Sequence, residues 1–489
     1  MAVIDEASDS VVVYHGRFVE CNDDWFIEGI WDDSFEKGNF DETDLVFGSG
    51  MRAGPDGLIF VSSSSMGDKL VYASHENSFF ISNSIPCLLS LTDIQLDPRY
   101  DYSRFFHSLK MNLENHKVIL PTKNGGISML FYDNLLYRSG NVYTKNKPAR
   151  NRFNDYSSLT DMLEGAFSRF RDNWTSSKRK WQVSSFSSLS TGYDSTVISC
   201  LASKAGCDTA FTCISSNRFG PRWLRPLSGK MDDDGTDIGR YIGCDCIKFD
   251  KYDYKKDLSN EIYLFAGLPN TRANNFLPVF NYLDRLNSPS LLFTGIGGDN
   301  AWDKKPPVSP GSAVDDVLAL SEIRLKTGFI HCPMLLWLAR FRNSLMSISD
   351  SENMRKWSVG DVYDRPVPRR IIEDRGVPRS LFGNIKKGSW TEIPVFNKPC
   401  DKGLRKQYYD YLVRFGICSR FQTGFLFPLI SFVFSVFTII RLILWKLRGS
   451  RGSFNVLAKP FGKVECTPFQ WAVSLIAKKY KKSFKNTNI

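Results

Sequence analysis

A short stretch rich in serine and glycine, followed at once by an apolar run, has the composition of an anion-binding loop. It reads Leu189-Ser190-Thr191-Gly192-Tyr193-Asp194-Ser195-Thr196 and continues as Val197-Ile198-Ser199-Cys200-Leu201. A loop that turns directly into a helix leaves backbone N–H groups unpaired at the positive end of the helix dipole, where a phosphate group binds well. Ser190 and Ser195 add hydroxyl donors, and Asp194 offers the carboxylate that a phosphate-bound Mg²⁺ needs. The stretch predicts a nucleotide site, and the competing interpretation is a strand-to-helix turn without a ligand.

A second glycine-rich turn could share that nucleotide. Leu291-Leu292-Phe293 is a strand-like apolar run, and Thr294-Gly295-Ile296-Gly297-Gly298-Asp299-Asn300 follows it. In an open parallel sheet, ligands bind at the carboxyl ends of the strands, so we expect both loops at one cleft. Asp194 and Asp299 would then hold Mg²⁺ on the triphosphate of ATP from opposite sides. The residues expected to contact ATP are Leu189, Ser190, Thr191, Gly192, Asp194, Ser195, Thr294, Gly295 and Gly297.

Neither loop has the pattern of the commoner nucleotide-binding motifs. A Walker A loop carries a Lys after its second glycine, and the nearest stretch, residues 383–389, has no Lys after Gly388. The first loop instead resembles the Ser-Gly-Gly-x-Asp-Ser pyrophosphate loop of the N-type ATP pyrophosphatases, in the form found in asparagine synthetase and β-lactam synthetase. Thr191 stands in place of its first glycine. The second loop resembles the Ser/Thr-Gly-x-Gly-x-Asp signature of the same family.

The resemblance has two departures at the second loop. Ile296 stands where asparagine synthetase has Glu and β-lactam synthetase has Tyr, and Asn300 replaces a common Glu. An acid–base or substrate-orienting role at position 296 is therefore lost. The departures concern the chemistry after adenylation, whereas phosphate and metal binding need not depend on them.

A third segment, residues 371–388, resembles the loop in which this family carries a catalytic lysine. In that family the lysine contacts the phosphates and stabilises charge while the acyl-adenylate forms and is attacked. Reaction at the α-phosphorus adds negative charge to the nonbridging oxygens, and a fixed ammonium in a dry cleft contributes several kcal/mol there. Lys386 and Lys387 are the two candidates, and the sequence does not choose between them. Taken singly, either one is more often a surface lysine.

The first part of the chain has the short alternating runs and turns of a β-rich domain. Strands are expected at residues 11–14, 57–61, 69–73, 78–82 and 125–131, with a short helix from residue 85. This order resembles the Ntn-amidotransferase domain of asparagine synthetase, which makes ammonia from glutamine with a cysteine exposed as residue 1 after Met removal. Here the second residue is Ala2, so we expect a degenerate domain without glutaminase activity, if this start is the real one. The alternative is a β-rich domain that only packs on the second.

The rest of the chain alternates strands and helices at the spacing of a parallel α/β sheet. A polar stretch at residues 145–154 is the expected linker, and Leu159, Leu163, Ala166, Phe167 and Phe170 then repeat at helical spacing. The expected fold is α/β: an Ntn-amidotransferase-like sandwich at residues 1–150, then a parallel-sheet ATP-pyrophosphatase (HUP-like) domain with a helical C-terminal part at residues 151–420.

β-Lactam synthetase and the lasso-peptide cyclases resemble asparagine synthetase without a working glutaminase, and they use an amine already present in the substrate.

An uncharged apolar run at residues 421–440 belongs to a hydrophobic segment that we place at residues 421–447. At 1.5 Å per residue, about 20 residues are long enough to cross ~30 Å of hydrocarbon. Three interpretations stay open: a membrane span, an anchor lying at the membrane surface, and a buried helix of the C-terminal part. Its richness in Phe, Ile and Leu favours membrane association. Residues 448–489 are expected to end in a basic amphipathic helix.

Composition sets broad limits on class and location. A net charge of +11 suits nucleic acid, a membrane surface or an anionic substrate such as ATP, so its sign alone does not decide. The chain has eleven cysteines without Cys-x-x-Cys pairs and only five histidines, which predicts a reducing compartment and no structural metal. The start of the chain lacks the basic and apolar regions of a secretory signal. We expect a cytoplasmic protein, either free or at the cytoplasmic face of a membrane.

The function that the resemblance implies is an ATP-dependent ligase that adenylates a small-molecule or peptide carboxylate with loss of pyrophosphate. An amine or ammonia then displaces AMP and leaves an amide. The expected cofactors are ATP and Mg²⁺. One alternative is an ATP pyrophosphatase that modifies RNA, although paired catalytic cysteines and an evident RNA-binding module are lacking, so nucleic acid is not favoured. The other is a catalytically degenerate nucleotide-binding or scaffold protein, which the departures at Thr191, Ile296 and Asn300 favour.

Overall fold

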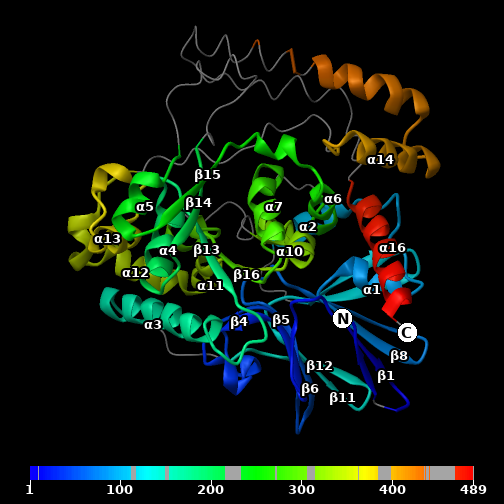
Figure 1. Cartoon of the computed structure of the whole chain (residues 1–489), viewed down its shortest axis with the longest axis horizontal. Helices are drawn as coiled ribbons and strands as arrows, with labels where there is room; N and C mark the ends of the chain where they lie inside the picture. The colour runs from blue at the N-terminus through cyan, green and yellow to red at the C-terminus, as the bar shows by residue number, and fades with distance from the viewer. Residues whose placement is uncertain are drawn as a thin grey trace.

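The computed structural model of this chain contains two antiparallel sheets, then a parallel sheet with helices, and a helical C-terminal region (Figure 1). The expected α/β class is confirmed. The structure describes residues 1–8, 10–111, 117–148, 153–214, 233–269, 273–304, 314–361, 363–383, 398–433, 435–436, 440 and 468–487.

The N-terminal part is a sandwich of two antiparallel sheets. The first sheet has the order β2-β1-β8-β7-β10-β9 and the second β12-β11-β6-β5-β4-β3. The strands of the first are β1 (Ala2–Asp5), β2 (Val11–Val13), β7 (Leu70–His75), β8 (Ser78–Ser82), β9 (Lys117–Thr122) and β10 (Gly125–Leu130). The strands of the second are β3 (Glu20–Cys21), β4 (Trp25–Trp31), β5 (Val46–Gly54), β6 (Gly57–Val61), β11 (Asn134–Arg138) and β12 (Asn141–Lys145).

Alternation along the strands builds the core between these sheets. Ile81 and Phe79 on β8 face inward and pack with Phe60 and Leu135 of the opposite sheet, whereas Phe80 points outward into a separate apolar cluster. That outer cluster also contains apolar side chains of α1 (Ile85–Leu91) and α2 (Tyr102–Met111). The strands and the short helix predicted from the sequence in this region are therefore confirmed.

The parallel sheet has the order β15-β14-β13-β16-β17. Its strands are β13 (Ser184–Ser188), β14 (Thr209–Cys213), β15 (Asp245–Phe249), β16 (Ser290–Phe293) and β17 (Phe329–Cys332). One face carries α3 (Tyr156–Trp174), α4 (Tyr193–Lys204) and α5 (Thr236–Ile242), and the other carries α6 (Glu261–Gly267), α7 (Leu277–Leu286) and α10 (Ser321–Thr327) (Figure 1). On β16, Leu291 and Phe293 face the first layer while Leu292 faces the second, so both faces of the sheet are buried.

The order of the strands reverses between β13 and β16. The chain runs from β13 outward to β14 and β15 and then returns to place β16 on the other side of β13, where both pair in parallel. Such a reversal is the place in an open α/β sheet where loops at the carboxyl ends of neighbouring strands leave room for a ligand. The two glycine-rich loops of the sequence follow these two strands.

Further helices surround the parallel sheet and connect it to the sandwich. They are α8 (Gly298–Trp302), α9 (Val314–Leu318), α11 (Met334–Leu338), α12 (Arg342–Asp350), α13 (Pro366–Asp374), α14 (Lys402–Arg414) and α16 (Phe469–Thr487). The buried guanidinium of Arg324 on α10 pairs with Glu28 of β4 and with Asp68, so a charge network joins the two parts. The last helix, α16, packs against both α1 and α6 (Figure 1).

The hydrophobic segment expected at residues 421–447 is described up to Val433, at 435–436 and at Ile440. It is helical from Arg420, with a π-helical turn at Gln422–Leu426. Within the described parts of the chain, no helix combines the length and the apolarity that a membrane crossing requires. Residues 437–439 and 441–447 lie outside the described residues, as does the stretch 448–467 that precedes α16.

Candidate functional site

The first loop lies at the carboxyl end of β13 and leads into the first turn of α4, whose N-cap is Gly192. The Ser190 and Ser195 hydroxyls are 2.6 Å apart, and Ser190 Oγ accepts the Gly192 N–H at 3.2 Å. Thr196 Oγ1 donates to the backbone oxygens of Ser190 and Gly192 and so fixes the loop on the helix. The residues from Ser190 to Gly192 are half-buried, so a ligand can reach these donors.

The position that departs from the family pattern, Thr191, has a partner of its own. Its backbone N–H and its hydroxyl both donate to Asp233 Oδ1, each at 2.9 Å. Asp233 lies two residues before Gly235, the N-cap of α5. A carboxylate thus occupies a backbone donor of the loop that is proposed for phosphate, and it places a negative charge beside that loop.

The second loop packs directly on the first. A Cβ at Gly295 would lie 2.4 Å from the Ser195 nitrogen, and a Cβ at Gly298 would lie 2.0 Å from Asp194 Cγ. Gly297 has φ +94° and its Cα faces the Leu336 backbone, so a side chain is excluded there too. Gly295 is required because the backbones of the two loops meet there, and Gly298 leaves room for the Asp194 side chain. The two loops therefore occupy one place at the end of the sheet.

Asp194 and Asp299 converge as expected, but the group between them is the guanidinium of Arg365. Arg365 Nη1 lies 2.6 Å from Asp194 Oδ1, and Nη2 lies 2.6 Å from Asp299 Oδ1. Arg365 Nε also donates to Asp303 Oδ1 at 2.9 Å. The Arg365 side chain is 1% exposed, against 15% for Asp194 and 37% for Asp299. Burial alone would lower the pKa of Arg365, but the neighbouring Asp194 and Asp303 charges raise it, so this cation keeps its charge.

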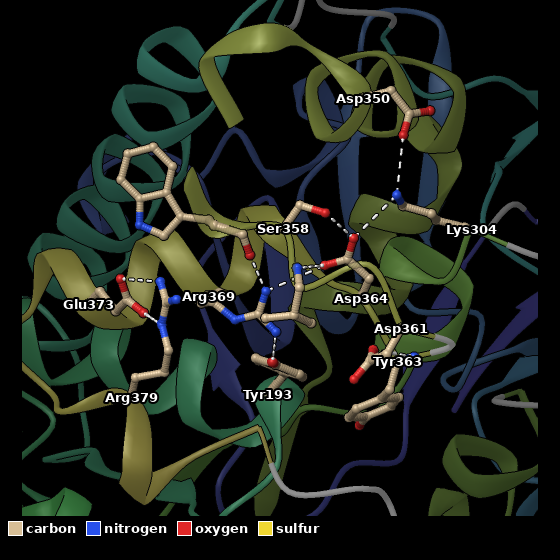
Figure 2. A network of polar contacts seen from close by, with 12 residues as sticks. Tyr193, Lys304, Asp350, Ser358, Asp361, Tyr363, Asp364, Arg369, Glu373 and Arg379 are labelled. Carbon is tan, nitrogen blue, oxygen red and sulfur yellow. Dashed lines mark hydrogen bonds and ion pairs between the residues drawn. The ribbon is translucent and has the colours of Figure 1, made fainter. Parts of the chain in front are cut away.

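The residue before Arg365 fixes its backbone. Asp364 accepts the Val359 N–H at 3.0 Å and lies 3.3 Å from Lys304 Nζ, and Ser358 also donates to it (Figure 2). Burial alone would raise the pKa of Asp364, but these hydrogen bonds and the Lys304 charge lower it below its ordinary value. Because α13 begins with Pro366 directly after Arg365, the arginine is held at a rigid helix start.

A second arginine of α13 reaches the residue next to Asp194. Arg369 donates to the Tyr193 hydroxyl and to the Trp357 carbonyl oxygen, and lies 3.4 Å from Asp364 (Figure 2). Gly383, with φ +76°, packs against the same Tyr193 hydroxyl, since a Cβ there would lie 2.6 Å away. Gly383 is the last described residue before the expected catalytic lysines. Lys386 and Lys387 themselves lie outside the described residues.

Two of the expected ATP contacts have side chains that serve the fold. Leu189 is 2% exposed, and its side chain packs against Gly235 at the start of α5. The Thr294 hydroxyl lies 2.8 Å from His331 Nε2 in the buried sheet. Burial, with the charge of Arg324, lowers the pKa of His331 to about 3, so this imidazole is neutral. These positions can offer a ligand backbone groups more readily than side chains.

An open hollow of about 490 Å³ lies on the surface of α5. Among the described residues it is lined by Asp237, Arg240 and Tyr241 of α5 and by Leu381. None of these described lining residues belongs to either glycine-rich loop, so this hollow carries no argument for a nucleotide site.

The donor chemistry fits Mg²⁺ carried by a nucleotide. Mg²⁺ is commonly held by one or two carboxylates with phosphate oxygens and water, and Asp194 and Asp299 are half-buried carboxylates facing one point. Within the described parts of the chain, no group of three or more His, Cys, Asp or Glu is arranged to hold a metal ion. Phosphate oxygens would therefore have to complete the coordination shell of Mg²⁺. Arg365 would also have to break its ion pair with at least one aspartate.

Sequence reasoning missed four residues that shape this site: Asp233, Asp303, Arg365 and Arg369. The acidic run that contains Asp233 is visible in the sequence, but nothing in it indicates a contact with Thr191. Pro366 marks a helix start, yet nothing in the spacing of Arg365 and Arg369 indicates that one side of α13 faces both loops.

No protein-family model matches the chain, and no curated protein matches it significantly.

Proposed function

We propose that this protein is an ATP-dependent, AMP-forming amide ligase of the asparagine synthetase superfamily. The single observation that carries the proposal is the convergence of Asp194 and Asp299, from the loops after β13 and β16, on one point at the reversal of the parallel sheet. The three ordered motifs of the sequence support the same conclusion, as does the sandwich of antiparallel sheets that precedes the parallel sheet.

In the proposed reaction, a carboxylate oxygen of the substrate attacks the α-phosphorus of ATP, and pyrophosphate leaves. An amine then attacks the acyl carbon, AMP leaves, and the amine loses a proton as the amide forms. Ser190, Gly192 and Ser195, at the start of α4, would bind the leaving pyrophosphate through hydroxyl and backbone N–H donors. Asp194 and Asp299 would hold Mg²⁺, which neutralises phosphate charge when bound.

Lys386 or Lys387 would stabilise charge on the α-phosphate. The support is indirect: Gly383, three residues before Lys386, packs on Tyr193, which neighbours Asp194. The amine would come from the substrate or from free ammonia. Ala2 lies on β1, between β2 and β8, and is 1% exposed, so its side chain faces the sandwich core and no open cleft.

A second candidate function is nucleotide binding without chemistry. The observation that favours it is Arg365, a buried cation already paired with both proposed Mg²⁺ ligands. If Arg365 stays in place, a nucleotide would bind without Mg²⁺ and the α-phosphate would lack its metal counter-charge. The two candidates therefore differ in whether ATP affinity depends on Mg²⁺.

The experiment that tests the proposal is ATP–pyrophosphate exchange with a panel of carboxylic acids and peptides, together with ATP titrations with and without Mg²⁺. The ligase predicts exchange that requires one class of carboxylate, and it predicts a loss of about 100-fold in Asp194→Asn, which can still accept from Arg365. Asp208→Asn is the matched control, since Asp208 is exposed at the amino end of β14, away from the loops. Exchange that persists in Asp194→Asn would refute the assigned role, and metal-independent binding without exchange would favour the second candidate.

A further inference from the structure

The helix that follows α14 exposes an apolar stripe. Phe421, Phe425 and Phe432 are 65%, 56% and 67% exposed. Among the residues that the structure describes in this segment, the exposed large apolar ones are Phe421, Phe425, Leu429, Phe432, Val436 and Ile440. Successive members are three or four residues apart, so those in the helix that runs to Val436 lie along one face. This helix lies at the edge of the molecule, coloured orange beyond α14 in Figure 1.

The polarity of this helix is the reverse of that expected at a protein–water surface. A surface helix normally buries its apolar face and exposes charges, yet the chain has no charged residue from 421 to 440. The opposite face of the helix is already in use, because Thr423, Phe427 and Ile430 are buried against the protein. A contiguous exposed apolar surface of this kind marks an interaction site.

The helix is firmly attached, so it presents the stripe as a fixed surface. Ser419 caps it, with Gln422 N–H donating to Ser419 Oγ at 3.2 Å, and the Phe427 ring packs on Tyr409 of α14. Its serines are satisfied within the helix: Ser431 Oγ donates to the Phe427 oxygen, and Ser435 Oγ donates to the Ser431 oxygen, both at 2.8 Å. These hydroxyls therefore do not need water, which lowers the cost of moving this face into an apolar medium.

The charge of the sequence that flanks the stripe favours one kind of partner. Between residues 411 and 464 the sequence has no Asp or Glu, and its basic residues are Arg414, Arg420, Arg441, Lys446, Arg448, Arg451, Lys459 and Lys463. Arg414 and Arg420 are exposed just before the stripe. The structure describes Arg414 and Arg420 of this set, and a basic flanking sequence repels a second copy of the same face. It is complementary to an anionic lipid surface, where each Lys or Arg contributes about 1 kcal/mol.

We propose that this helix docks the protein on an anionic lipid bilayer, lying in the plane of the interface with its aromatic stripe among the acyl chains and with Arg414 and Arg420 at the headgroups. Thr423, Phe427 and Ile430 stay packed against the protein, so the helix need not leave its place to bind. The proposal is independent of the ligase activity.

The test is co-sedimentation of the full chain with vesicles of phosphatidylcholine alone or with 30% phosphatidylglycerol, a probe composition of the order used for anionic surfaces. We expect the protein to bind the anionic vesicles at about 0.15 M salt. This binding should weaken at about 0.5 M salt, because the added ions screen the attraction between the basic residues and the lipid headgroups. Phe425→Glu/Phe432→Glu should reduce that binding at least about tenfold. Ile119→Glu on β9 is the matched control, since Ile119 is 64% exposed but lies in another part of the molecule.

Other occupants give other results. Sedimentation equilibrium showing a dimer that Phe432→Glu dissociates, with no vesicle binding, would overturn the proposal in favour of a second copy. A monomer that ignores vesicles of both compositions would overturn it too, and would indicate that other residues of the chain cover the stripe. Circular dichroism and thermal unfolding of both variants establish that each one is folded.

Discussion

Arg365 Nη1 lies 2.6 Å from Asp194 Oδ1, so the carboxylate proposed for Mg²⁺ is already paired with a buried cation. Arginine pairs with phosphate as readily as with carboxylate, because its planar fork matches both. If Mg²⁺-ATP binds here as proposed, every charge would stay paired if the aspartates held Mg²⁺ and Arg365 paired with the phosphates instead. Without nucleotide, Arg365 and Mg²⁺ would compete for the same carboxylate oxygens.

This competition makes a prediction for Arg365→Gln. Removing the guanidinium leaves Asp194, Asp299 and Asp303 near one another without their cation, which should destabilise the fold by about 2–4 kcal/mol, less than for a fully buried pair because two of the aspartates are partly solvated. Added Mg²⁺ should restore much of that loss, since it binds only the folded state. Thermal unfolding against MgCl₂ concentration, without nucleotide, measures both effects.

Arg379→Gln is the control for that experiment, because Arg379 pairs with Glu373 on the surface near the same site (Figure 2). The thermal unfolding midpoint of Arg379→Gln should differ little from that of the wild type and should not respond to Mg²⁺. An equal response to Mg²⁺ in the wild type and in Arg365→Gln would mean that the guanidinium and the metal do not share ligands.

Asp233→Asn should tighten the binding of ATP and pyrophosphate. The Asp233 carboxylate holds Thr191 through two hydrogen bonds and lies beside the proposed phosphate loop. An amide keeps an acceptor for Thr191 but removes a negative charge, which is worth roughly 1 kcal/mol, or about fivefold in affinity, at a half-exposed site. Isothermal titration measures the change, with Asp208→Asn as a distant carboxylate of the same sheet. Weaker binding in Asp233→Asn would show that its charge positions the loop for the ligand.

The sequence was sufficient to predict those elements whose local pattern agrees with the fold. The short apolar run of β8, the apolar spacing of α3 and the Ser/Gly turn before α4 are each visible in the local sequence. The meeting of the two loops followed from one rule about parallel sheets. Arg365 could not be found in this way, because its contacts join α13 to loops far away in the sequence and arise only from how α13 packs.

Acid should destabilise this protein in part through His331. Burial, with the charge of Arg324, lowers the folded-state pKa of His331 to about 3 from its ordinary 6.5. Between these values the unfolded chain binds the proton and the folded chain does not, so stability falls as pH drops from about 6.5 towards 3. The loss should reach about 2 kcal/mol by pH 5. Chemical unfolding at pH 7 and pH 5, compared between the wild type and His331→Gln, isolates this contribution.

The comparison with a variant is needed because Glu322 acts in the opposite sense. Burial raises the pKa of Glu322 to about 7, so its contribution to stability increases as pH falls from 7 to about 4.5. That contribution cancels in the difference between the wild type and His331→Gln. His107→Gln is the control, because its imidazole is exposed on α2. A pH dependence in His331→Gln identical to that of the wild type would mean that His331 does not titrate with unfolding.

The glycine that joins the two loops gives the most direct test of the site. A methyl group at Gly295 would lie 2.4 Å from the Ser195 nitrogen, so Gly295→Ala must push the second loop away from the start of α4. We expect a loss of about 1–3 kcal/mol in unfolding free energy and a loss of Mg²⁺-dependent ATP binding, because Asp299 moves away from Asp194. Gly192→Ala is the matched control for stability, since its nearest neighbour would be Ser190 Oγ at 3.4 Å and its φ of −79° suits any residue. If Gly295→Ala bound ATP and Mg²⁺ like the wild type, metal binding would not depend on the contact between the two loops. Asp194 and Asp299 could then not be the metal ligands.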